Sequence, residues 1–141
     1  MLLASNSQKI KYFIAAFILL SGLMAMANAS ADVYVICNSN LGATDADIKD
    51  LFTGEKQAIG GTKVVPVDNK SAQGEFLAKV VALTKVKYDS NWAKKSFRDG
   101  LTAPSVLGGD ADVTAHVKAN PGGCGYVASA PSDGVKLVKK Y

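Results

Sequence analysis

Short runs of β-branched and other apolar residues alternate with segments of helical periodicity from Asp32 to the carboxyl terminus, and this alternation constrains the fold most. Such alternation is typical of an α/β domain, in which helices pack on the faces of a sheet. The run Val33-Tyr34-Val35-Ile36-Cys37 is almost continuously apolar, so it predicts a central strand that is buried on both faces. The run 63–67 predicts a second strand, and Pro66 indicates an end or edge position because proline cannot donate to a ladder.

The segments between and after these strands predict four amphipathic helices. Most have a recognisable start and stop, with a polar residue that can cap the first turn and a glycine or proline beyond the last. At the first helix, Asp47 lies three residues after Thr44, as in a capping box. The predicted helices run from Thr44 to Gly54, from Ser71 to Leu83, from Asp89 or Ser90 to Gly100, and from Asp110 to Asn120. Two further strands, 125–128 and 135–138, are joined through a turn at 131–134.

Residues 1–29 predict a secretory signal peptide. Two lysines precede an apolar run at 12–27, and Ala27-Asn28-Ala29 provides the small residues of a cleavage site. The run has 16 residues and a serine interrupts it, whereas a helix that spans a bilayer takes about 20 apolar residues. We therefore expect cleavage with Ser30 or Asp32 as the mature start, and a periplasmic or secreted location. An uncleaved membrane anchor is the alternative.

Cleavage there leaves 112 residues, which are enough for one hydrophobic core, so we expect residues 30–141 to form a single domain. Residues 32–141 contain no internal repeat, low-complexity tract or domain linker. Loss of Lys9 and Lys11 with the leader leaves 14 basic and 12 acidic residues, a net charge of +2. The basic residues are scattered and no basic run alternates with aromatic residues, so the sequence does not support nucleic-acid binding.

Cys37 and Cys124 are the only cysteines of the chain. In an exported domain such a pair favours a disulfide. Cys37 ends the first predicted strand and Cys124 precedes the strand 125–128, so antiparallel pairing of these strands would bring the two sulfurs together. Two buried thiols are the alternative. A metal or redox site would need a Cys-x-x-Cys pair or additional histidine ligands, and we expect no metal and no cofactor.

Four local motifs occur in a fixed order along the chain. They are Asp47-Ile48-Lys49-Asp50-Leu51-Phe52-Thr53-Gly54, Val64-Val65-Pro66-Val67, a lone Trp92, and Pro121-Gly122-Gly123-Cys124-Gly125-Tyr126-Val127. This order resembles one lobe of the periplasmic phosphate-binding proteins, the substrate-binding components of phosphate ABC transporters, over nearly all of residues 33–128. The resemblance implies one lobe of a type II periplasmic-binding-protein fold, with a mixed sheet of about five strands and helices on both faces. Those proteins close two lobes around a ligand, whereas the expected mature chain has room for one.

The resemblance also implies an anion site at the start of the second helix, directly after the strand 63–67. In the family an arginine and a serine- and glycine-rich helix start grip phosphate. Here Asn69 and Lys70 lie near the place of the arginine, which is absent, and Ser71 and Gly74 are kept. A helix start favours anions by itself, because its N–H groups lack partners and carry about half a positive charge. A simple N-cap at Ser71, with solvent beyond it, is the alternative.

A second group of candidate anion ligands follows the first strand. Ser39 lies in the loop after this strand, and Thr44 opens the next helix. Ligands of α/β sheets bind outside the carboxyl ends of strands, so we expect Ser39 and Thr44 to support an anion held at Ser71. An ordinary polar connection is the alternative.

Four ring-bearing side chains have both a structural and a functional interpretation. Trp92 and Phe97 could line a cleft, but packing against the sheet is the favoured interpretation, and Tyr126 is also expected to be structural. His116 has no clear catalytic partner, and no nucleophile is paired with a base. We therefore expect no enzymatic activity.

These observations predict a small exported binding module of the phosphate ABC transporter substrate-binding type, which binds phosphate or another oxyanion weakly. Its expected partners are the anion, a membrane transporter or another envelope protein, and a second copy of the chain, whose association could rebuild a cleft. The alternative is a non-catalytic structural or interaction module of the cell envelope that has lost ligand binding.

Overall fold

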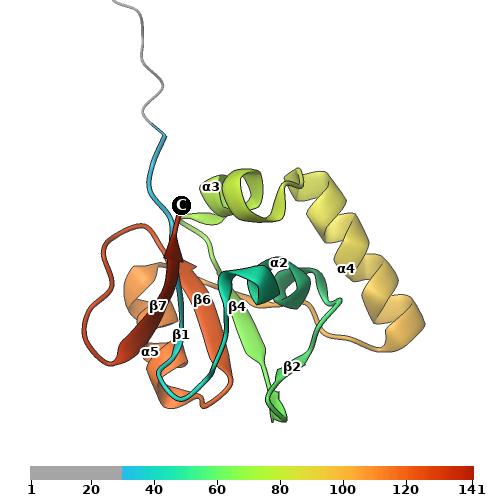
Figure 1. Ribbon diagram of the computed structural model, residues 1–141. Coiled ribbons are helices and arrows are strands. Elements are labelled where there is room, and N and C mark those ends of the chain that lie inside the picture. Colours follow the sequence, from blue (N-terminus) through green and yellow to red (C-terminus); the bar gives the residue numbers. More distant parts are fainter. Residues whose placement is uncertain (1–29) are drawn as a thin grey trace, which may run out of the picture.

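A mixed sheet of five strands forms the centre of the computed structural model, which describes residues 30–141 (Figure 1). The signal peptide expected at residues 1–29 lies outside the described residues. In chain order the elements are β1 (Tyr34–Asn38), α2 (Asp45–Thr53), β2 (Ala58–Ile59), β3 (Thr62–Lys63), β4 (Val65–Asn69), α3 (Gln73–Phe76), the π-helical turn η1 (Leu77–Val81), α4 (Lys85–Asp99), β5 (Ser105–Leu107), α5 (Asp110–Ala119), β6 (Gly123–Val127) and β7 (Val135–Lys140).

The strands lie in the order β5-β4-β6-β1-β7. β4 pairs in parallel with β5 and β6, whereas β1 pairs antiparallel with both β6 and β7. β1 is therefore antiparallel to the other four strands of this sheet, which are parallel to one another. As a result, the carboxyl end of β1 lies at the amino ends of β4 and β6.

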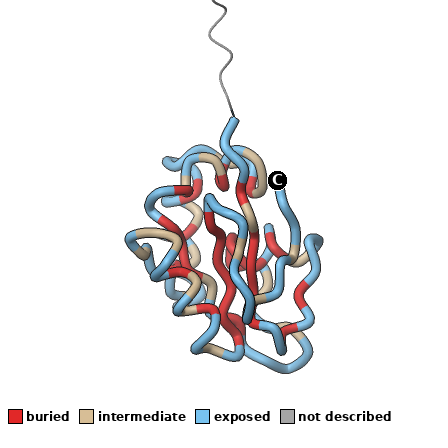
Figure 2. Tube along the Cα trace, turned by 90° about the vertical axis from the view of Figure 1, so that its left-hand side faces the viewer, coloured by how far each residue is buried: buried red, intermediate tan, exposed pale blue. Residues whose placement is uncertain are grey.

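Alternate residues of β1 face two different cores, as expected for a strand that is buried on both faces. Val35 and Cys37 pack with residues of α2, α3, η1 and α4 on one face. Ile36 packs with Val113 and Val117 of α5 on the other face. Figure 2 shows the buried residues concentrated along the central strands. The α/β fold with helices on both faces of a mixed sheet is confirmed.

Cys37 and Cys124 lie opposite each other in the β1–β6 ladder and form a disulfide, with their Cα atoms 4.1 Å apart. The expected pairing is therefore confirmed. The bond joins residues that are 87 positions apart in the sequence, and in the chain-entropy model a loop of this length adds about 4 kcal/mol of stability. A disulfide fits an oxidising extracellular or periplasmic compartment.

The second helix does not begin where its sequence predicts. Ala72, and not Ser71, is the N-cap residue of α3. Asn69 Oδ1 accepts hydrogen bonds from the backbone N–H of Ser71 at 3.0 Å and from its hydroxyl at 2.7 Å. These bonds hold Ser71 in a turn, so the helix starts later.

The third helix begins earlier than predicted, at Lys85 instead of Asp89 or Ser90. The hydroxyl of Thr84 accepts a hydrogen bond from the N–H of Lys87 and caps the first turn. This extends α4 to 15 residues.

Phe97 does not pack against the sheet, and the expectation that it would is wrong. Its side chain is 92% exposed, whereas Trp92 is buried in the core. The two residues lie five positions apart on α4, which at 3.6 residues per turn separates their directions by about 140°. One helix therefore cannot direct both rings into the same core.

The sequence analysis did not predict the short strands β2, β3 and β5, and it assigned the segment 131–134 to the wrong kind of connection. The hairpin β2–β3 turns through Gly60 and Gly61, whose φ values are 54° and 81°, and β5 has three residues. The segment 131–134, predicted as a turn between the last two strands, belongs to a crossover, because β1 lies between β6 and β7. Ser132 of this crossover lies 3.5 Å from the ammonium of Lys118 on α5.

Candidate functional site

Asn69 joins the carboxyl ends of the parallel strands. Its side chain is fully buried, and its amide group donates to Asp110 at 2.7 Å and to the carbonyl oxygen of Tyr126 at 3.0 Å. Its oxygen accepts the two bonds from Ser71 described above. The sequence predicted Asn69 and Ser71 as anion ligands, and the structure brings them together. Their polar groups bond to each other and to the protein, so they hold the turn that follows β4.

Asp110 occupies the start of α5. Its carboxylate accepts hydrogen bonds from the backbone N–H groups of Ala128 and Ser129, each at 3.1 Å, in addition to the bond from Asn69. The three donors come from the ends of β4 and β6 and not from α5 itself. The carboxylate of Asp110 therefore takes up the donors that these strand ends would offer to an anion.

An open hollow of about 710 Å³ lies between the start of α3 and the start of α4. Lys70 and Gln73 contribute to it from the segment after β4, and Thr84 and Lys85 contribute from the start of α4. Gly74, in the first turn of α3, also lines it. The first N–H groups of a helix have no intrahelical partners, so Gln73 and Gly74 each have a backbone donor without a partner within the helix.

A second hollow of about 380 Å³ shares Gln73 and Lys85 with the first and contains the buried carboxyl group of Asp68. Asp68 accepts hydrogen bonds from the hydroxyl of Tyr88 at 2.9 Å and from that of Tyr126 at 2.8 Å. Burial raises the pKa of Asp68, against the opposing effect of these two donors. Burial and the neighbouring Asp68 also raise the pKa of both tyrosines.

The two lysines at the first hollow differ in their surroundings. The ammonium of Lys85 lies 2.6 Å from both carboxylate oxygens of Asp89, one helical turn away. Lys70 is exposed and belongs to no ion pair within residues 30–141. Lys70 is therefore the cation of this hollow that is available to a ligand without breaking another bond.

Thr44 is the N-cap of α2, as predicted, and its polar groups are directed to Asp47. Its backbone N–H and its hydroxyl both donate to one oxygen of Asp47 at 2.9 Å. A hydrogen bond from Lys56 and those from Thr44 lower the pKa of Asp47 to about 2. A carboxylate therefore stands at this helix start.

Ser39 lies just beyond the carboxyl end of β1. Because β1 runs antiparallel to β6, this end adjoins the amino ends of β4 and β6, where Pro66 pairs with Cys124. Ser71 follows the carboxyl end of β4, so it lies at the opposite end of the strands from Ser39. The structure thus brings Lys70, Asn69 and Ser71 together and places Ser39 away from them.

Sequence reasoning missed Gln73, Thr84 and Lys85. The start of α4 was predicted too late, which hid the fact that a second helix start faces the segment after β4. The sequence signal for it is Thr84, a threonine directly before a helical pattern. The imidazole of His116 links α5 to β4, with its Nε2 atom 3.1 Å from the carbonyl oxygen of Val65.

The fold is similar to that of an ABC-type phosphate transport receptor from Vibrio cholerae, whose crystal structure matches with a TM-score of 0.50 and 14% sequence identity. The match covers 77% of this chain and 46% of the receptor, so the chain spans less than half of the receptor's length. No protein-family model matches the chain, and no curated protein matches it. At this identity the likeness shows the fold alone.

Two general features of residues 30–141 bear on the kind of site. No helix in this range has the length and apolar character needed to cross a membrane. The same range holds no group of three or more His, Cys, Asp or Glu side chains placed to bind a metal ion.

Proposed function

We propose that this chain is a small exported binding module of the phosphate ABC transporter substrate-binding type, which binds phosphate or another oxyanion weakly and catalyses no reaction. The observation that carries this proposal is the hollow that Lys70 and Lys85 line together with Gln73 and Gly74, the first residues of α3, beyond the carboxyl end of β4. Open α/β sheets bind ligands at this edge. The similar fold of a phosphate transport receptor supports the same class of ligand.

In this proposal Lys70 and the amides of Gln73 and Gly74 contact the oxyanion, and Asn69 and Ser71 hold the turn that presents them. Lys85 contributes charge from α4, shared with Asp89. Lys70 and Gly74 are exposed. Contacts between exposed charges are weak, so we expect affinity in the millimolar range unless a partner covers the hollow.

We further propose that residues 30–141 are one domain, exported to the periplasm or secreted after removal of residues 1–29. A membrane transporter, another envelope protein or a second copy of the chain would cover the hollow and strengthen binding. The disulfide and the likeness to a transport receptor support this setting.

Calorimetric titration of the exported protein with phosphate, sulfate and uncharged glycerol tests the proposal. We expect saturable heat with an oxyanion and none with glycerol. Lys70→Gln should weaken binding by about tenfold, because it removes one charge-assisted hydrogen bond. Lys49→Gln is the matched control, since Lys49 is an exposed lysine on α2.

Equal affinity in Lys70→Gln and Lys49→Gln would contradict the assignment of the hollow. A folded Ser71→Ala variant examines Ser71 separately: we expect it to lose stability through the turn while binding changes less than in Lys70→Gln.

A non-catalytic interaction module is the second candidate function. The outer face of α4 favours it, because Phe97 is 92% exposed and Val86, three helical turns away, is 78% exposed. Exposed apolar patches mark contact surfaces, and these two side chains point to the same side of α4. Absence of heat with every oxyanion, together with capture of a defined envelope protein that Phe97→Ser abolishes, would favour this candidate.

A further inference from the structure

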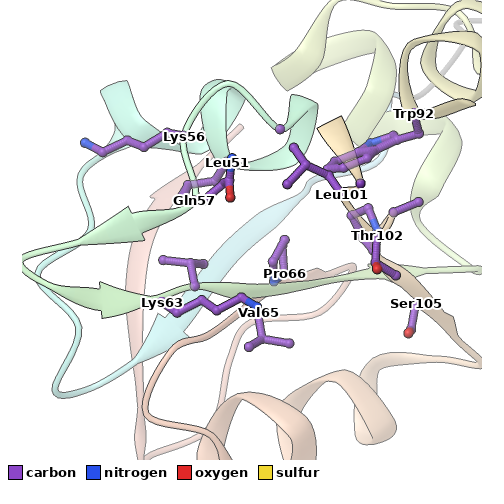
Figure 3. A pocket seen from close by; sticks show the side chains of 15 residues that line it. Leu51, Lys56, Gln57, Lys63, Val65, Pro66, Trp92, Leu101, Thr102 and Ser105 are labelled. Carbon is purple, nitrogen blue, oxygen red and sulfur yellow. The ribbon is translucent and has the colours of Figure 1, made fainter. Parts of the chain in front are cut away.

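A separate cavity of about 270 Å³ lies at the amino ends of β4 and β5, at the opposite end of β4 from the proposed oxyanion site (Figure 3). The end of α2, the hairpin β2–β3 and the segment 100–105 surround it. The proposed oxyanion site lies beyond the carboxyl end of β4, so the two sites share no lining residue.

Trp92 forms a fixed wall of this cavity. Its indole N–H donates to the carbonyl oxygen of Phe52 at 3.0 Å, which sets the orientation of the ring. Gly54 has a φ of 77°, and a Cβ atom there would lie 3.0 Å from the ring. The chain thus passes directly against the indole. A wall held in this way loses little freedom when a ligand binds.

The remaining apolar surface complements the indole. Figure 3 shows Trp92 and Leu101 on one side of the cavity and Pro66 on the other, with Val65 on the far side of β4. An indole and a proline ring both present flat faces. A cavity lined by both rings suits an aromatic ring, which stacks on an indole in offset geometry. Small-molecule sites have volumes of about 300–1,000 Å³, so this cavity suits a single ring with a short side chain.

The polar lining indicates an anionic group on the ligand. Lys56, Gln57 and Lys63 line the hairpin side of the cavity, and none of its fifteen lining residues is acidic. The ammonium of Lys56 lies 2.5 Å from Asp47, and Figure 3 shows its side chain directed away from the cavity. Lys63, in contrast, takes part in no ion pair within the described part of the chain. It is therefore the cation available to a ligand here.

We propose that this cavity binds a small aromatic monocarboxylate. The ring lies between Trp92 and Pro66, and the carboxylate accepts hydrogen bonds from Lys63 and from the amide group of Gln57. This site is additional to the oxyanion site and does not depend on it.

Trp92 is the only tryptophan of the chain, so its fluorescence reports on the cavity directly. The probes are 3-phenylpropionate, its uncharged amide and propionate, which lacks the ring. We expect a saturable change in emission with 3-phenylpropionate, and binding weaker by about tenfold for each of the other two. Saturation with phosphate should leave the affinity for 3-phenylpropionate unchanged.

Lys63→Gln should weaken binding of 3-phenylpropionate by about tenfold and leave binding of the amide unchanged, because only the charge pair is lost. Lys49→Gln, on the exposed face of α2, should change neither. The proposal is overturned if 3-phenylpropionate gives no saturable change, if the carboxylate and the amide bind equally, or if Lys63→Gln has no effect on the carboxylate.

Discussion

At the scale of single residues, Asp68 is the least expected feature of the protein. A carboxyl group that is 2% exposed would be costly if it were unpartnered, and two tyrosine hydroxyls donate to it. Burial still raises its pKa above the ordinary value of 3.8. Asp68 is followed directly by Asn69 and Lys70, so its packing fixes the start of the turn at the proposed oxyanion site.

The raised pKa of Asp68 predicts how stability depends on pH. The folded state holds the proton more tightly than the unfolded state, so the stabilising contribution is fully present below pH 3.8 and is lost as pH rises through the folded pKa. Asp68→Asn should remove this part of the pH dependence, because the amide does not titrate. Urea denaturation of both proteins across this pH range measures it. Asp133→Asn, at an exposed aspartate, is the control, and an unchanged pH dependence in Asp68→Asn would contradict the account.

At the scale of elements, α5 packs on the sheet through a glycine. A Cβ atom at Gly125 would lie 2.5 Å from Cγ1 of Val113 and 3.2 Å from Cγ2 of Val67. Both valines are buried and branched, so neither can move aside easily. The glycine before Tyr126 in the sequence motif is therefore explained by close approach of a helix to β6.

Gly125→Ala should destabilise the fold by about 1–3 kcal/mol through overpacking. Val113→Ala creates room, so the double variant should lose less stability than the sum of the two single variants. Chemical denaturation of the four proteins gives this coupling. Gly42→Ala is the control, since no atom lies within 4 Å of a Cβ placed there. Additive losses would show that Gly125 acts in another way.

The elements also show which parts of the fold a sequence pattern can predict. β1 was predicted because its residues form an almost continuous apolar run, which the structure explains by burial against two cores, and the disulfide was expected from antiparallel pairing with β6. The hairpin β2–β3 and the strand β5 are two and three residues long, which is too short for any periodicity. Phe97 could have been assigned correctly, because Tyr88 and Trp92 already share the buried face of α4 by their spacing.

The candidate site was only partly predictable for a similar reason. Lys70 and Ser71 directly follow a predicted strand and precede a predicted helix, so their region was identified from local pattern alone. Ser39 was placed with them because all carboxyl strand ends were expected on one side of the sheet, whereas β4 pairs in parallel with β6 and β1 is antiparallel to β6. Lys85 lies 15 residues beyond Lys70, and only the packing of α4 brings it to the same hollow.

At the scale of the whole molecule, the openness of the hollow limits the affinity expected of the proposed oxyanion site. The chain corresponds to 46% of the similar phosphate transport receptor, and the hollow at Lys70 faces solvent. Contacts to an exposed anion are screened by salt, so affinity should fall as ionic strength rises. A partner that covers the hollow would exclude solvent from it and would reduce the screening by salt.

The central claim, that an oxyanion binds beyond the carboxyl end of β4, is tested most directly by mapping backbone amides. Amide correlation spectra of the ¹⁵N-labelled exported protein are recorded during a phosphate titration at constant ionic strength. The account predicts saturable shifts of the amides of Gln73, Gly74 and Lys85, with those of Ala128 and Ser129 unmoved because Asp110 occupies them. Absence of saturable shifts at the first three amides, or shifts confined to the starts of α2 and α5, would contradict it.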